Sequence, residues 1–82
     1  MVNVVFDDHF QRTISKIKDA EVQKSIKNKI RKIVEDPEIG KPMRNVRKGT
    51  REVYAGHFRL SYNYHKERET IEFLDFYHKD EQ

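Results

Sequence analysis

The stretch that decides the fold runs from residue 50 to residue 79 and reads TREVYAGHFRLSYNYHKERETIEFLDFYHK. Apolar or aromatic side chains occupy every second position from 58 to 64, and Arg59 lies between two of them. Because successive side chains of a strand point to opposite faces, this alternation predicts a strand with one aromatic face and with Arg59 on the other. The charged run at 65–69 predicts a turn, and the β-branched and aromatic run Thr70 to Tyr77 predicts a second, antiparallel strand. The second strand then ends beside the start of the first.

Upstream of this hairpin, a short apolar run from Val2 to Phe6 predicts an N-terminal strand. Asp7 or Asp8 follows as a helix cap, because a short carboxylate accepts the free N–H groups of a first helical turn. Apolar residues spaced four and three apart then predict a first helix over 9–18. These residues are Phe10, Ile14 and Ile17.

A second helix is predicted by the longest periodic apolar pattern in the chain. Asp19 is its expected cap, and the helix is expected to stop at Glu35 or Asp36 because Pro37 disfavours helical geometry before it. Five apolar residues fall on one stripe at helical spacing: Val22, Ile26, Ile30, Ile33 and Val34. Each helix therefore has one apolar side, and both are expected to pack on one face of the sheet.

The remaining segments complete the expected topology. Gly and Pro predict a loop at 37–42, and we expect a short strand at 43–46, a basic turn at 47–50 and a strand at 51–55. The order β-α-α-β-β-β, with a helical hairpin packed on an antiparallel sheet, predicts an α+β fold. With 82 residues, the chain is expected to be a single domain over 1–82.

Composition narrows the function classes. The chain has no cysteine, which excludes a disulfide framework and a thiolate zinc site. No apolar run approaches the roughly 20 residues that a membrane helix needs, so we expect a cytoplasmic protein without a membrane partner. The histidines show no metal-ligand spacing, and no cofactor is expected.

Charge is segregated along the chain, although the net charge is only +3. Residues 11–32 carry eight Lys or Arg against two acids, and residues 41–59 carry six against one. Residues 66–82 reverse the balance, with three Lys or Arg against six acids. This asymmetry favours a polyanion or an acidic protein segment as partner, and a merely solvated charged surface stays open as the equal alternative.

The whole chain resembles the RelE/ParE superfamily of small bacterial and archaeal toxins. The resemblance rests on the strand–helix–helix opening, on KGTREVYAGHFRLSYNY at 48–64 and on FLDFYHKDEQ at 73–82. Glu52, Gly56, Arg59 and Tyr62 fall in register with the family pattern, and a late His-Lys pair follows. The resemblance implies a toxin held inactive by an antitoxin, which we expect to be acidic and partly helical. RelE-type members cleave messenger RNA at the ribosome, whereas ParE-type members poison DNA gyrase.

The RelE-type reaction indicates which side chains to examine. Metal-free RNA cleavage needs proton transfer and stabilisation of charge on the phosphorane. Arg59, which matches the family arginine, can hold two phosphate oxygens without losing its charge. His78 matches the family histidine and titrates near neutral pH, and the hairpin is expected to bring it beside Arg59. The predicted catalytic set is Arg59, His78, Lys79, Tyr77 and Glu52.

Basic and aromatic residues around this set are predicted to bind RNA through phosphates or stacking. They are Lys48, Arg51, Tyr54, Arg47 and Arg44. The chain departs from the family pattern in two places: Tyr54 stands where a second arginine is frequent, and no tyrosine follows the His-Lys pair. Three alternatives therefore stay open: a structural ion pair between Arg59 and Glu52, a ParE-like gyrase inhibitor, and a catalytically weakened module that binds RNA or antitoxin.

Overall fold

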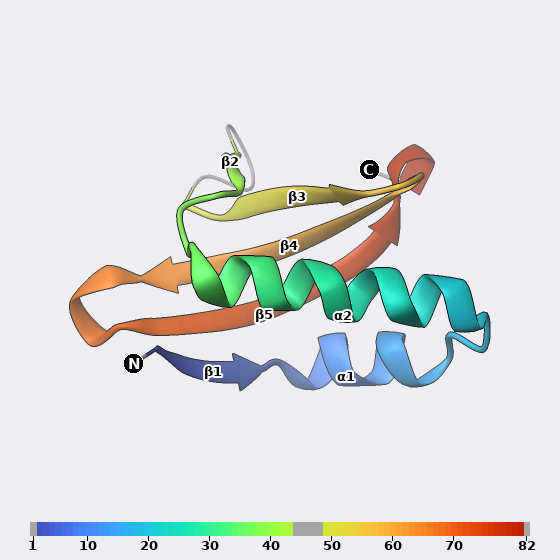
Figure 1. Ribbon diagram of the computed structural model, residues 1–82, viewed down its shortest axis with the longest axis horizontal. Helices are drawn as coiled ribbons and strands as arrows, with labels where there is room; N and C mark the ends of the chain where they lie inside the picture. The colour runs from blue at the N-terminus through green and yellow to red at the C-terminus, as the bar shows by residue number, and fades with distance from the viewer. Residues whose placement is uncertain (1, 44–48, 82) are drawn as a thin grey trace.

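The computed structural model describes residues 2–43 and 49–81 and contains two helices and five strands. Figure 1 shows their arrangement along the chain. The elements are β1 (Asn3–Phe6), α1 (Asp8–Ser15), α2 (Ala20–Glu35), β2 (Lys41–Pro42), β3 (Arg51–Ala55), β4 (Phe58–His65) and β5 (Thr70–His78). Two short 3-10 turns, η2 (Lys66–Arg68) and η3 (Lys79–Glu81), follow β4 and β5.

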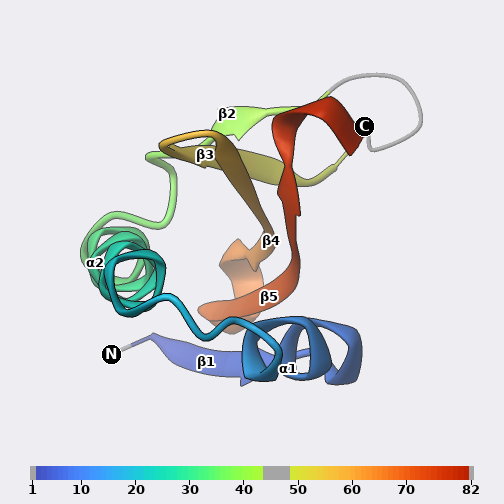
Figure 2. The same cartoon turned by 90° about the vertical axis from the view of Figure 1, so that its right-hand side faces the viewer.

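The strands form one sheet in the order β1-β5-β4-β3-β2. The pairs from β5 to β2 are antiparallel, whereas β1 pairs with β5 in parallel. The predicted α+β fold is confirmed, and the sheet is antiparallel apart from its β1 edge. In Figure 2, α2 lies to one side of the twisted sheet, and α1 lies beside β1 and displaced towards the other side. Both helices nevertheless contribute apolar residues to one core, as expected: Phe10 of α1 and Ile26 and Ile33 of α2 lie in the same buried cluster.

The helices begin where the sequence predicts, because aspartates cap them. The Asp7 carboxylate accepts from His9 N at 2.9 Å, and Asp19 accepts from the backbone N–H groups of Glu21 and Val22. α2 ends at Glu35 as predicted. α1 stops at Ser15, three residues before the predicted end, because the N–H groups of Lys16 and Ile17 bond back only three residues, to Thr13 O and Ile14 O, and the α-helical pattern is not continued.

The core lies between α2 and the sheet. Leu60, Tyr62, Ile71 and Phe73 are fully buried, as is Ile33 of α2. The aromatic face predicted for the first hairpin strand is thus the core face. Fully burying side chains of this size stabilises a fold by roughly 1.5–3 kcal/mol each.

A β-bulge interrupts the pairing of β4 with β5. Ser61 pairs with Asp75 and Tyr62 pairs with Phe73, so Leu74 is skipped. A bulge shifts which face each following residue occupies. The shift explains why apolar residues occupy both odd and even positions of β5. Phe76 lies beyond the bulge and therefore joins Phe73 in the core.

The connection from α2 to β2 is fixed by the buried Tyr62. Its hydroxyl donates to Pro37 O at 2.8 Å and accepts from Gly40 N at 2.9 Å. Burial raises the pKa of Tyr62 above its ordinary value of 10.0.

A two-residue strand, β2, occupies 41–42, the last two positions of the loop expected at 37–42, because these residues pair with β3. Positions 44–46 of the expected strand, and 47–48 of the expected basic turn, lie outside the described residues. Within the described part of the chain, no helix is long and apolar enough to cross a membrane.

Candidate functional site

The candidate site lies on the face of the sheet that is turned away from the core, which we call the outer face. Directly paired residues of antiparallel strands share a face. Tyr54, Arg59 and Tyr77 form one such row across β3, β4 and β5. Glu52 and Asp75 flank Ser61 in the adjacent row. The alternation of the sequence alone had already predicted that Arg59 lies opposite the aromatic core face.

Arg59 is held by an aromatic ring and a carboxylate. Its guanidinium carbon lies 3.7 Å from the centroid of the Tyr54 ring, and its Nε lies 3.6 Å from Glu52 Oε1. The Arg59 side chain is 17% exposed, whereas Tyr54 is 52% exposed. Cation–π contact and ion pairing both restrict the rotamers of a long side chain, so the guanidinium is presented in a defined place on the outer face.

Glu52 is the buried anion of this cluster, with 6% of its side chain exposed. The Tyr77 hydroxyl donates a hydrogen bond to Glu52 Oε2. A buried carboxylate is costly unless it is paired and hydrogen-bonded, and Arg59 and Tyr77 meet both needs. Glu52 thus links Tyr77 to Arg59, and the Arg59–Glu52 ion pair that the sequence left open as a structural alternative is present.

His78 does not join this cluster. It lies at the same end of the β4–β5 hairpin as Arg59, but it pairs with Phe58 and therefore faces the core side of the sheet. Its ring contacts Phe58 edge-on at 5.4 Å and lies 6.1 Å from the His57 ring, centroid to centroid. The predicted meeting of Arg59 and His78 over one hollow is wrong, because the bulge moves His78 to the other face.

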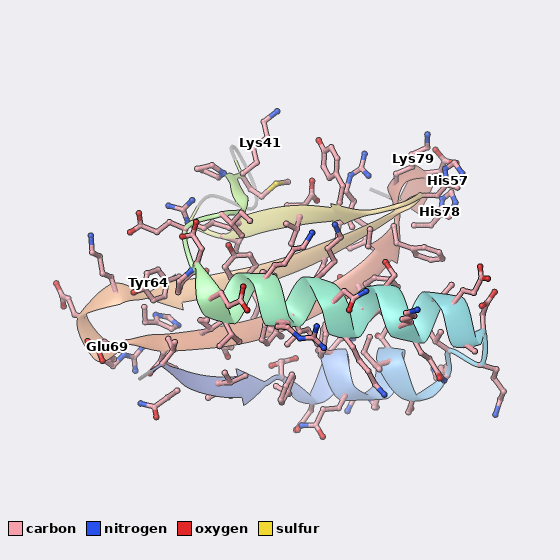
Figure 3. The ribbon with its side chains drawn as sticks, viewed as in Figure 1. Lys41, His57, Tyr64, Glu69, His78 and Lys79 are labelled. Atoms are coloured by element: carbon pink, nitrogen blue, oxygen red, sulfur yellow. The ribbon has the colours of Figure 1, made fainter. Side chains whose placement is uncertain are left out.

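The remaining predicted residues divide between two places. Lys79 lies with His57 and His78 at the hairpin end (Figure 3). Arg51 pairs with Tyr62 and lies on the core side, where its guanidinium donates to Glu38 O and Gly40 O. This placement separates Arg51 from the outer face.

Three predicted RNA-binding residues, Arg44, Arg47 and Lys48, lie outside the described residues.

One residue that the sequence reasoning missed is Lys41. It pairs with Glu52 across β2 and β3 and is exposed, so it borders the outer face. Figure 3 shows its side chain extending from β2. Its place in a basic segment was the available signal, but only the strand register assigns it a face. Over 2–43 and 49–81, the structure has no group of three His, Cys, Asp or Glu that is suited to a metal ion.

A separate apolar groove of about 560 Å³ lies between α1 and α2. Phe6, Phe10, Ile14, Ile26 and Ile30 line it, with Lys27 among the polar residues at its border. Phe6 is 42% exposed, which is unusual for a large apolar side chain. The groove and the outer face are thus distinct candidate surfaces.

The family model described as "ParE toxin of type II toxin-antitoxin system, parDE" matches residues 4–82, so the chain belongs to this family. The predicted membership of the RelE/ParE superfamily is confirmed. Comparison with curated protein sequences gives no match.

Solved structures with the same fold belong to RelE-type systems. The RelBE2 toxin–antitoxin complex of Mycobacterium tuberculosis contains a chain that is 24% identical, with a TM-score of 0.81 over 94% of this chain and 96% of that chain. The intact RelBE complex of Escherichia coli contains a chain that is 16% identical, with a TM-score of 0.78 over 95% of this chain and 96% of that chain. Isolated Escherichia coli RelE is 17% identical, with a TM-score of 0.79 over 95% of this chain and 84% of that chain. At these identities the likeness shows the fold.

Proposed function

We propose that this toxin is a metal-independent endoribonuclease that cleaves messenger RNA at the ribosome, with Arg59 as its phosphate ligand. The observation that carries the proposal is the immobilised guanidinium of Arg59 on the outer face, between the exposed Tyr54 ring and the buried Glu52 carboxylate. A fixed, permanently charged donor is what the transition state of phosphoryl transfer requires.

Each neighbour of Arg59 then has a defined task. Glu52 and Tyr77 orient the guanidinium from beneath, since both are buried. Tyr54 offers an exposed ring on which a base of single-stranded RNA stacks. Lys41 and Lys79, both exposed, attract the backbone phosphates on either side.

The test is cleavage of a defined message in a translation extract, with mapping of the RNA ends. Arg59→Ala is expected to lower the cleavage rate by about 10²-fold or more, because a charge partner of the transition state is lost. Arg68→Ala, an exposed arginine in η2, is the matched control and should leave the rate unchanged. Intact message with the wild-type toxin contradicts the proposal, and ribosome binding without cleavage supports a weakened binding module instead.

Inhibition of DNA gyrase is the second candidate function. Two observations favour it: the matching family model is that of the ParE toxin, and His78 faces away from Arg59. A supercoiling assay with purified gyrase separates the two functions. Under the ribonuclease proposal, supercoiling is unaffected at toxin concentrations that arrest translation; loss of supercoiling alone would assign the toxin to gyrase.

We further propose that the groove between α1 and α2 receives an apolar helix of the cognate antitoxin. Two of the structural relatives are complexes of a toxin with its antitoxin. The groove is apolar at its base and has Lys27 at its border, which suits an amphipathic segment with acidic residues along its edge.

Phe6→Ala is expected to weaken antitoxin binding about 30-fold or more, because truncating an aromatic hot-spot residue at the centre of an interface costs about 2 kcal/mol or more. The matched control is Ile39→Ala: Ile39 is also a large exposed apolar residue, at 47%, but it does not line the groove. Isothermal titration calorimetry with the antitoxin measures the affinity of both variants. Equal affinities for the two variants would place the antitoxin elsewhere.

A further inference from the structure

Lys41 lies at the β2 border of the outer face. A histidine of α1, His9, lies at the opposite border and contacts β5. His9 Nε2 lies 3.0 Å from Asp75 Oδ1, although the two residues are 66 positions apart in the chain. The same carboxylate oxygen accepts from the N–H of Phe76 at 2.8 Å. Asp75 is thus fixed by its own strand and in turn holds the imidazole ring. The ring remains accessible, because 57% of the His9 side chain is exposed.

The pairing register places this pair close to Arg59. Arg59 pairs with Tyr77, and Asp75 is two residues before Tyr77 on the same strand and face. Diagonal neighbours of this kind are about 7–8 Å apart. The His9 ring, held by Asp75, is therefore on the same face of the sheet as the Arg59 guanidinium and is joined to its neighbourhood by one residue of β5.

The tautomer of His9 follows from its partner. An ionised carboxylate only accepts hydrogen bonds, so the proton of neutral His9 is on Nε2, and Nδ1 carries the free lone pair. An aspartate that holds one ring nitrogen in this way also stabilises the imidazolium that forms when the other nitrogen takes a proton. The contact with Asp75 therefore orients the His9 ring so that its Nδ1 can accept a proton.

We infer that His9 is the general base of the toxin's RNA cleavage and that Asp75 is its positioning residue. The inference rests on the ribonuclease function proposed above, and it supplies the proton acceptor that His78, on the other face, does not provide.

Nδ1 of His9 takes the proton of the ribose 2′-hydroxyl, and the 2′-oxygen forms a bond to phosphorus. The bond from phosphorus to the 5′-oxygen breaks, and the leaving oxygen takes a proton from water. Arg59 stabilises the charge on the phosphorane, and the products are a 2′,3′-cyclic phosphate and a 5′-hydroxyl end. His9 then returns its proton to solvent.

A second pair of the same chemistry provides a control within the same sheet. His65 Nε2 lies 3.4 Å from Glu72 Oε1, and both side chains are one-third exposed. This pair lies near the η2 end of the β4–β5 hairpin, whereas Arg59 lies near its other end. A histidine–carboxylate contact that merely ties elements together should matter equally at both places.

The experiment measures the cleavage rate of the message against pH for wild-type toxin and for His9→Gln, Asp75→Asn and His65→Gln. Glutamine at position 9 keeps a donor for Asp75 but does not transfer a proton. We expect His9→Gln to lower the rate by about 10²-fold or more, and His65→Gln to leave it unchanged. Chemical analysis of the wild-type products should find a cyclic phosphate.

Asp75→Asn separates positioning from structure. Asp75 from β5 is the charged group that contacts the ring, and Asp7, Asp8 and Arg12 are the charged residues on or next to its own helix. Without the Asp75 carboxylate the His9 ring loses the partner that fixes its orientation, so Asp75→Asn should lower kcat while KM changes little. A purely structural contact would leave kcat unchanged in a folded variant.

The outcomes distinguish this inference from the function it rests on. No cleavage by wild-type toxin overturns the ribonuclease function and the role of His9 with it. Cleavage by wild type that persists in His9→Gln overturns the role of His9 alone and leaves Arg59 as the phosphate ligand. Equal melting temperatures of wild type and His9→Gln establish that a loss of rate does not reflect unfolding.

Discussion

At the residue scale, Tyr62 shows how one side chain serves both the core and the chain path. Its ring is fully buried beneath α2, and its hydroxyl bonds to Pro37 O and Gly40 N at the end of that helix. The close approach needs a glycine, since a Cβ at position 40 would lie 2.6 Å from the tyrosine oxygen. The loop from α2 to β2 is therefore anchored on β4.

Tyr62→Phe is expected to lower the free energy of unfolding by about 1–3 kcal/mol, because the buried N–H of Gly40 loses its acceptor. The substitution also changes the pH dependence. Burial raises the pKa of folded Tyr62 above the unfolded value of 10.0, so its contribution is complete below pH 10 and is lost as the pH rises through the folded value. Urea unfolding between pH 8 and 11 tests this: wild type should lose stability in the alkaline range faster than Tyr62→Phe does. Parallel curves would contradict the assignment.

The sequence predicts Arg59 and misplaces His78 for one physical reason. In a regular ladder closed by the pairing of His65 with Thr70, His78 would pair with His57 and share the face of Arg59. Skipping Leu74 moves the pairing by one residue, so His78 pairs with Phe58 instead. A bulge leaves no clear signal in the sequence, whereas the period-two alternation of β4 does. The same shift brings Tyr77 to Arg59 and Asp75 to His9.

At the scale of elements, the well-predicted ones have strong local signals. α2 has an aspartate cap, a long apolar stripe and a proline just beyond its end, and all three agree. β2 has two residues and no pattern of its own, so only its pairing with β3 defines it. The parallel β1 edge was not predictable either, because it depends on distant contacts such as the stacking of Phe6 on Phe73 at 5.4 Å.

The bulge yields a prediction about β5. Deleting Leu74 would make the ladder regular while keeping Phe73 paired with Tyr62 and Asp75 paired with Ser61. We expect the deletion variant to fold and to lose only a modest part of its stability. Deletion of Ser61 from β4 is the control, since it removes a residue that has a partner and should abolish folding. Circular dichroism and thermal melting compare them; an unfolded Leu74 deletion would show that the bulge itself is required.

At the scale of the whole molecule, two groups of cations among the described residues lie on different surfaces. The polar side of α2 carries Lys24, Lys29, Arg31 and Lys32, with acidic Glu21 and Glu35 among them. The outer face, with Lys41 at its border, is turned away from α2 (Figure 2). RNA bound at Arg59 therefore meets the cations around the outer face and not those of α2.

This geometry predicts which lysines govern the salt dependence of RNA binding. For single strands, log K falls with log salt concentration with a slope of about −0.7 for each phosphate contact. Lys41→Ala should reduce the slope by about 0.7, since it removes one contact beside Arg59. Lys24→Ala, which removes the same charge from the polar side of α2, should leave the slope unchanged. Fluorescence anisotropy with a 2′-deoxy oligonucleotide, which binds but is not cleaved, measures both variants between 50 and 300 mM salt. A slope that depends on Lys24 and not on Lys41 would place the RNA on α2 and remove it from the outer face.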